Sequence, residues 1–101
     1  MPDFKNLCST ADVAPGTGKC IEVDGTPVAV FNVDGQFHAI SHTCAHQGGP
    51  LGEGLLEGTV VTCPWHGWQF DVTTGVSPLI PTAMVERYEC RVEGHQVQVA
   101  L

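Results

Sequence analysis

The chain has little positive charge, few aromatic residues and no long apolar run. Its 101 residues include four Lys and Arg against eleven Asp and Glu, a formal net charge of −7. A nucleic-acid-binding domain needs a basic face to contact phosphates, and this chain has too few cations to form one. No stretch approaches the ~18 apolar residues of a membrane-spanning helix, and the first residues lack the apolar segment of a secretory signal. We therefore expect no nucleic-acid partner, no membrane partner and a cytoplasmic location.

The excess of acidic residues has two interpretations. An acidic surface steers a domain toward positively charged docking patches on partner proteins. Net negative charge also simply keeps a small protein soluble. Hydrophobic residues make up 43% of the chain, which is enough for a core. The length predicts a single domain over residues 1–101, which we expect to be a monomer.

Strand signals dominate the pattern, and a long helix is not indicated anywhere. Asp24-Gly25, Asp34-Gly35 and Glu93-Gly94 each separate two apolar runs, which is typical of β-hairpins. The segment from Ala11 to Gly16 could form one helical turn at most. The predicted strands are residues 19–23, 26–33, 36–41, 55–56, 59–62, 68–72, 87–92 and 96–100. This pattern predicts an all-β fold, an antiparallel sandwich or small barrel.

The middle of the chain differs in composition from the two ends. Residues from His42 to Gly54 are rich in Gly, Pro, Cys and His, and they are predicted to form a loop. Pro78 and Pro81 prevent regular strand pairing further along. We therefore predict that residues from about 42 to 81 form a small subdomain, inserted into a β base domain, that carries the functional loops.

Two short Cys/His pairs stand in this middle segment. Cys44-Ala45-His46 is followed after sixteen residues by Cys63-Pro64-Trp65-His66. Two thiolates and two imidazoles on two loops fit a [2Fe–2S] centre in which two Cys hold one iron and two His hold the other. The alternative is a zinc-stabilised interaction module. Structural zinc sites usually combine C-x2-4-C with H-x3-5-H, whereas here each loop supplies one Cys and one His.

The segments CAHQGGPL and CPWHGWQFD resemble the cluster-binding loops of Rieske proteins. A chain of this size is similar to the Rieske-type ferredoxins of multicomponent aromatic-ring dioxygenase systems. The resemblance implies that Cys44 and Cys63 hold one iron, and that His46 and His66 hold the other near the surface. It also implies a one-electron carrier rather than an enzyme, which accepts electrons from a flavoprotein NAD(P)H reductase and passes them to a terminal Rieske non-haem-iron oxygenase. The alternative within the family is a permanent small subunit of a larger oxidoreductase, such as an assimilatory nitrite reductase.

Residues beside the proposed ligands have secondary roles in this hypothesis. Glycines such as Gly48 and Gly67 allow tight loops and close approach of backbone N–H groups to the sulfides. Trp65, Gln47 and Pro81 are predicted to form an apolar docking collar around the imidazoles, the alternative for Trp65 being simple packing over the cluster.

The sequence departs from the Rieske subunits of respiratory complexes. The extra cysteines of those subunits, which form a disulfide, correspond here to Gly49 and Trp65. Their hydroxyl residues after the second ligand histidine correspond to Trp68 and Phe70, which we expect to face the subdomain core. Hydrogen bonds to the sulfurs raise the reduction potential, so their absence predicts a value near the low end of roughly −150 to +300 mV.

The remaining cysteines and histidines are expected to have structural roles. Cys8, Cys20 and Cys90 are predicted to be buried free thiols that pack as small apolar groups. His38, His42 and His95 are predicted to be solvated or internally hydrogen-bonded, and a role for His42 in tuning the cluster is a hypothesis only.

Overall fold

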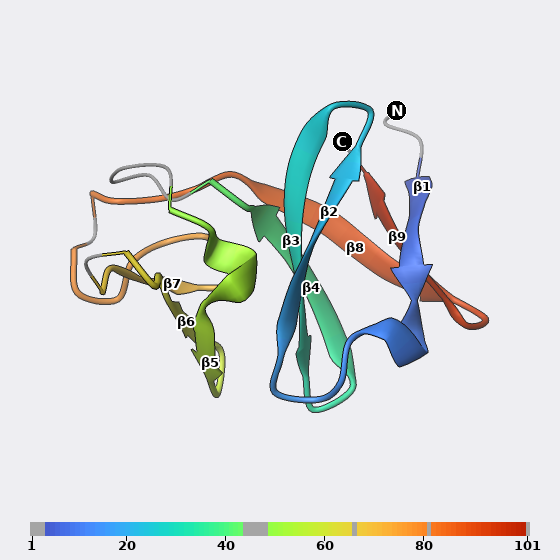
Figure 1. Cartoon of the computed structure of the whole chain (residues 1–101), viewed down its shortest axis with the longest axis horizontal. Coiled ribbons are helices and arrows are strands. Elements are labelled where there is room, and N and C mark those ends of the chain that lie inside the picture. Colours follow the sequence, from blue (N-terminus) through green and yellow to red (C-terminus); the bar gives the residue numbers. More distant parts are fainter. Residues whose placement is uncertain (1–3, 44–48, 66, 81, 101) are drawn as a thin grey trace.

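The computed structural model describes residues 4–43, 49–65, 67–80 and 82–100 (Figure 1). Strands and two 3-10 helices, η1 and η2, are the regular elements of these residues. None of the helices in these ranges is long and apolar enough to cross a membrane. The elements are β1 (Phe4–Ser9), η1 (Thr10–Asp12), β2 (Gly18–Val23), β3 (Thr26–Val33), β4 (Gln36–Ser41), η2 (Leu51–Glu53), β5 (Leu55–Glu57), β6 (Val60–Thr62), β7 (Gln69–Asp71), β8 (Arg87–Glu93) and β9 (Gln96–Ala100).

The strands form two antiparallel sheets. The larger has the order β1-β9-β8-β4-β3-β2, and the smaller has the order β5-β6-β7. Figure 1 shows the larger sheet curling around one half of the molecule, with the small sheet beside it. The curl brings edge strand β1 into contact with the opposite edge strand β2, and Lys5 forms an ion pair with Asp24 across this junction. The prediction of an all-β, barrel-like fold is therefore confirmed.

The three predicted hairpins are present. Asp24 and Gly25 both have positive φ, as do Asp34 and Gly35, which is the condition for type I′ turns. These turns join β2 to β3 and β3 to β4. Gly94 has a φ of 62° in the turn between β8 and β9. Glycine, or aspartate beside it, accepts this backbone conformation at low cost, so the local sequence was sufficient to predict each turn.

Two elements were not predicted, and a third begins earlier than expected. Strand β1 pairs with β9 at the other end of the chain, and only Leu7 of its residues is buried. The helical turn expected within residues 11–16 lies earlier, because Ser9 and Asp12 form a capping box around η1. Helix η2 lies within the predicted loop. The other strands agree with prediction to within about one residue at each end.

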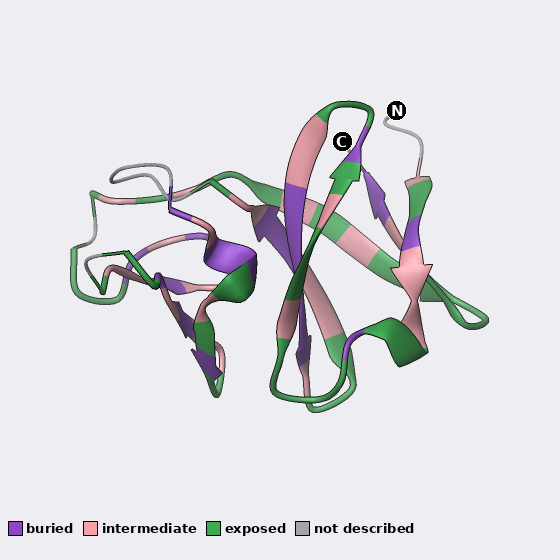
Figure 2. Ribbon diagram, in the orientation of Figure 1, coloured by how far each residue is buried: buried purple, intermediate pink, exposed green. Residues whose placement is uncertain are grey.

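Two groups of buried side chains form the interior. The base core consists of Leu7, Val13, Val23, Val28, Val30, Ala39, Val97 and Val99. The site core consists of Ala29, Phe31, Ile40, Leu51, Leu56, Val61, Cys63, Phe70 and Val72. Strand β3 supplies alternate residues to both, because successive side chains point to opposite faces of a strand. Figure 2 shows its buried stretch in the middle of the molecule. The small sheet is therefore packed directly onto the large one.

The prediction for the three other cysteines was only partly right. Cys8 and Cys90 are half-buried free thiols, and burial raises the pKa of Cys90 to about 11. Cys20 is exposed, so the prediction of a buried thiol was wrong there. Its strand, β2, is an edge of the large sheet and has a neighbouring strand on one side only.

Candidate metal centre

The second Cys/His loop joins β6 to β7 of the small sheet. The Cys63 N–H donates to the Trp68 carbonyl oxygen at 2.7 Å, which closes the turn. Gly67 has a φ of +75°, a backbone conformation that residues other than glycine rarely adopt. The Cys63 side chain is 2% exposed and belongs to the site core, so its sulfur lies inside the base of the loop.

The two tryptophans of this loop have different environments. Trp65 is 50% exposed near the tip of the loop. Trp68 is half-buried and packs against the site core, of which Phe70 is a fully buried member. Trp68 and Phe70 were predicted to face the subdomain core, and both face the site core, which the small sheet shares with β3 and β4 of the large sheet.

The first Cys/His loop is described at its two ends. Thr43 forms an isolated β-bridge with Pro50, which brings the ends of the loop together. Four of the predicted site residues of this loop lie outside the described residues, as do two others further along the chain: Cys44, His46, Gln47, Gly48, His66 and Pro81.

The end of the first loop contacts the second loop at Gly49. A Cβ placed on Gly49 would lie 2.5 Å from the Cys63 Sγ and 3.1 Å from the Trp65 Cβ. The two positions that correspond to the disulfide cysteines of respiratory relatives, Gly49 and Trp65, are therefore in contact here. Sequence reasoning missed the contact of Gly49 with Cys63, for which the only signal was the position of Gly49 within the CAHQGGPL motif.

This contact tests whether a metal group fits. Gly49 lies so close to the Cys63 sulfur, at the point where the two loops meet, that a side chain at this position would overlap the sulfur. The fit of a metal group rests on the donor chemistry, because the Cys63 thiol lies at this meeting point and thiolate sulfur is a preferred ligand of iron–sulfur clusters. The described residues alone contain no group of three or more His, Cys, Asp or Glu side chains that is suited to hold a metal ion, and three of the four proposed ligands lie outside them. The residues present fit a metal group between the loops.

His42 and His38 flank the site without being predicted ligands. The His42 Nδ1 accepts a hydrogen bond from the Gly52 N–H at 3.0 Å, as expected for an internally bonded histidine. Burial lowers the pKa of His42, and the Glu53 carboxylate opposes this shift. Burial also lowers the pKa of His38, and the positive charge of Arg87 adds to the effect. Both rings are consequently biased toward the neutral form.

Asp71 anchors the turn that follows β7. Its carboxylate accepts hydrogen bonds from the Thr73 N–H at 2.8 Å, from the Thr73 hydroxyl at 2.5 Å and from the Thr59 hydroxyl at 3.2 Å. Burial raises the pKa of Asp71, but these hydrogen bonds together outweigh burial and lower it. The carboxylate is therefore charged at neutral pH and holds the end of the small sheet.

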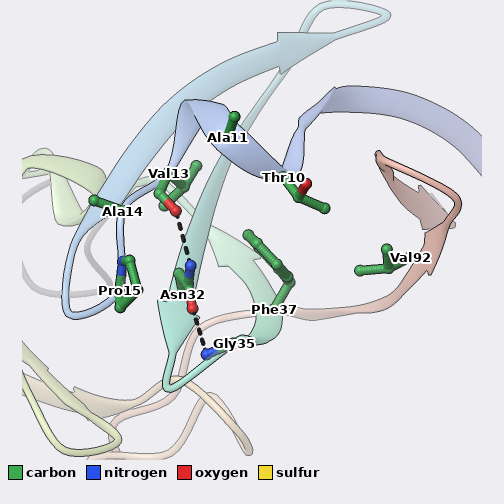
Figure 3. Close-up of a pocket in the computed structure, with 9 residues that line it drawn as sticks. All are labelled: Thr10, Ala11, Val13, Ala14, Pro15, Asn32, Gly35, Phe37 and Val92. Carbon is green, nitrogen blue, oxygen red and sulfur yellow. Dashed lines mark hydrogen bonds between the residues drawn. The ribbon is translucent and has the colours of Figure 1, made fainter.

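A depression of about 630 Å³ lies away from the Cys/His loops, between η1, the β3–β4 turn and β8 (Figure 3). Its lining is mainly apolar, with Phe37 and Val92 on one side. The amide of Asn32 is already used, because it donates to the Val13 carbonyl at 2.8 Å and accepts from the Gly35 N–H at 2.7 Å. Its lining residues include no Cys, His, Asp or Glu, so it is not the metal centre.

Comparison with known proteins places this arrangement among iron–sulfur domains. A family model described as Rieske [2Fe-2S] domain matches residues 3–89. The chain is 40% identical to the biphenyl dioxygenase ferredoxin subunit of Pseudomonas sp. (strain KKS102), over 95% of this chain and 90% of that one.

Two solved structures are also similar. One is a ferredoxin chain in a complex of reduced oxygenase and oxidized ferredoxin of carbazole 1,9a-dioxygenase, with a TM-score of 0.86, 37% identity and coverage of 96% of this chain and 92% of that one. The other is described as a putative NADH-dependent nitrite reductase small subunit from Mycobacterium tuberculosis, with a TM-score of 0.92, 26% identity and coverage of 100% and 96%.

Proposed function

This chain belongs to the family of Rieske [2Fe-2S] domains, and we propose that it is the ferredoxin component of a dioxygenase system. It takes single electrons from a flavoprotein NAD(P)H reductase and delivers them to a terminal Rieske non-haem-iron oxygenase. The observation that carries this proposal is the similarity to dioxygenase ferredoxins over nearly the full length of both chains. As a carrier, the protein makes and breaks no substrate bond, and we propose that it acts in the cytoplasm.

The proposed ligands are Cys44 and Cys63 on one iron, with His46 and His66 on the other. The cluster, when bound, supplies the site that accepts and releases one electron. The proposal is supported by the position of Cys63, whose sulfur is buried at the base of the second loop and adjoins Gly49 at the end of the first. Proposed neighbours that shape the site are Gln47, Gly48, Trp65, Gly67, Trp68 and Pro81.

The chain's own residues hold the loops and exclude water on the protein side. The site core packs behind Cys63, and the short β6–β7 hairpin fixes the second loop at both ends. Burial on one side of this loop and the half-exposed Trp65 on the other give the loop an inner and an outer face. We propose that the imidazole ligands face outward, where a partner protein can approach.

The first test is the composition and spectrum of protein purified without oxygen. We expect a brown-red protein that contains iron and acid-labile sulfide, with a midpoint potential near the low end of the Rieske range. The potential is expected to be low because the positions of the sulfur-bonding hydroxyls carry Trp68 and Phe70, which have none. A colourless protein containing zinc would contradict the proposal and favour an interaction module.

The second candidate function is that of a permanent small subunit of a nitrite reductase, favoured by the overall similarity to such a subunit. Gel filtration of the native protein separates the two. A free monomer supports the carrier, and constant co-elution with a large oxidoreductase chain supports the subunit.

Replacing Trp65 with alanine tests the proposed docking collar. We expect electron transfer to the oxygenase to slow by about tenfold, or ~1.4 kcal/mol, because half of this large ring is exposed beside the proposed ligand His66. The visible spectrum should not change. Stopped-flow measurement with reduced protein gives the rate, and Leu55→Ala, an exposed apolar residue on β5, is the control. An unchanged rate for Trp65→Ala would mean that the ring only packs over the cluster.

A further inference from the structure

His42 precedes the first Cys/His loop. Both its main chain and its ring accept hydrogen bonds from residues that follow the loop. Its carbonyl oxygen accepts from the Leu51 N–H at 2.9 Å, and its Nδ1 accepts from the Gly52 N–H at 3.0 Å. These bonds lie next to the Thr43–Pro50 bridge. We call this place, where the two ends of the loop meet, the neck of the loop. One residue therefore holds together the two chain segments between which the loop emerges.

The two N–H groups that His42 binds are at the beginning of helix η2. The first N–H groups of a helix have no partner within the helix, and a side chain at the N-cap position usually accepts from one of them. The N-cap residue here is Pro50, which makes no such side-chain bond. His42, eight positions earlier in the chain, supplies the acceptors that Pro50 lacks.

The neck is also fixed to the large sheet. The His42 N–H donates to the carbonyl oxygen of Pro27 on β3 at 3.2 Å. Gly52 is packed so closely against β2 that an added Cβ would lie 2.9 Å from the Cys20 nitrogen. Leu51, next to Gly52, is fully buried in the site core together with Cys63. The same set of contacts therefore connects the neck of the first loop to the cysteine of the second.

We infer that His42 is a positioning residue: it caps η2 across the neck of the first loop and so holds that loop in the geometry that binds the cluster. This inference rests on the proposed function, because the first loop carries Cys44 and His46. The role inferred for the ring is that of a hydrogen-bond acceptor, through the Nδ1 that binds the Gly52 N–H. A loop held at its neck loses less conformational freedom when it binds the cluster, so the loaded state is favoured.

Two substitutions separate the hydrogen bond from the bulk of the side chain. In His42→Asn the Oδ1 can take the place of Nδ1 and accept from the Gly52 N–H. In His42→Leu a methyl group stands there and the N–H loses its acceptor. All variants are purified without oxygen. The rate of cluster loss to an iron chelator is followed by absorbance, and the EPR spectrum of the reduced protein reports the geometry at the irons.

We expect His42→Leu to lose its cluster about tenfold faster than the unaltered protein, equivalent to ~1.4 kcal/mol, with altered EPR g values. His42→Asn should behave like the unaltered protein. The control for general destabilisation is Val99→Ala, a cavity in the base core. The inference is overturned if His42→Leu matches the unaltered protein, if His42→Asn is equally impaired, or if Val99→Ala produces the same loss for the same fall in melting temperature.

Failure of this inference can be told apart from failure of the proposed function. Should the unaltered protein contain no iron and sulfide, the proposed function fails. The cap is then judged by the melting temperatures alone, where His42→Leu must lie below His42→Asn for the capping role to stand.

Discussion

Replacing Gly49 with alanine should leave the protein folded but unable to hold its cluster. The added Cβ would lie 2.5 Å from the Cys63 Sγ and 3.1 Å from two atoms of Trp65, well inside normal contact distances. In a well-packed interior, one extra methyl group costs about 1–3 kcal/mol, because the neighbours must move. As a proposed iron ligand, the Cys63 sulfur would not be free to move. The strain is therefore relieved by giving up the metal bond.

The expected result for Gly49→Ala is a fall in iron and acid-labile sulfide to about a tenth of the unaltered content, or ~1.4 kcal/mol. Metal analysis and the visible spectrum measure this, and circular dichroism checks the fold. The matched control is Gly58→Ala. At this turn the backbone φ is +63°, and an added Cβ would meet no atom within 4 Å. It tests the loss of a glycine without the contact. A fully loaded Gly49→Ala protein would contradict the proposed position of the metal group beside Cys63.

Replacing Cys63 with alanine should give a colourless protein that still folds. The change removes a proposed ligand from the site core, where the side chain is 2% exposed. The packing cost is small, about 1 kcal/mol for a group of this size. Loss of a thiolate leaves one iron with an incomplete ligand set, because each iron of a Rieske centre has two protein ligands. Near-complete loss of cluster absorption is therefore expected.

The controls for Cys63→Ala are the same substitution at Cys20 and at Cys90. Cys20 is exposed on β2, and Cys90 is a half-buried thiol of β8, so neither lies in the site core. Both control variants should keep the full iron content and colour. If Cys63→Ala kept its iron, or if Cys20→Ala lost it, the proposed ligand set would be wrong. Zinc analysis of the same samples would reveal an interaction module instead.

The elements that local chemistry controls were predictable. The Asp-Gly pairs were sufficient to predict the turns at Asp24 and Asp34, since few other residues accept positive φ there. Strand β1 was not predictable, because only one of its residues, Leu7, is buried and it pairs with β9 at the other end of the chain. Helix η2 was missed for a different reason. Its cap is His42, which a search for a capping residue next to the helix does not find.

The amino-acid sequence alone determined the all-β class and predicted the kinds of metal ligand and the two loops proposed to carry them, because these follow from residue type and spacing. Folding decided which of those residues meet. Gly49 contacts Cys63, His42 caps a helix beyond the loop, and Cys20 is left exposed at a sheet edge. Each of these facts depends on how segments well apart along the chain pack together. That packing is decided in the tertiary structure, where β3 contributes side chains to both cores.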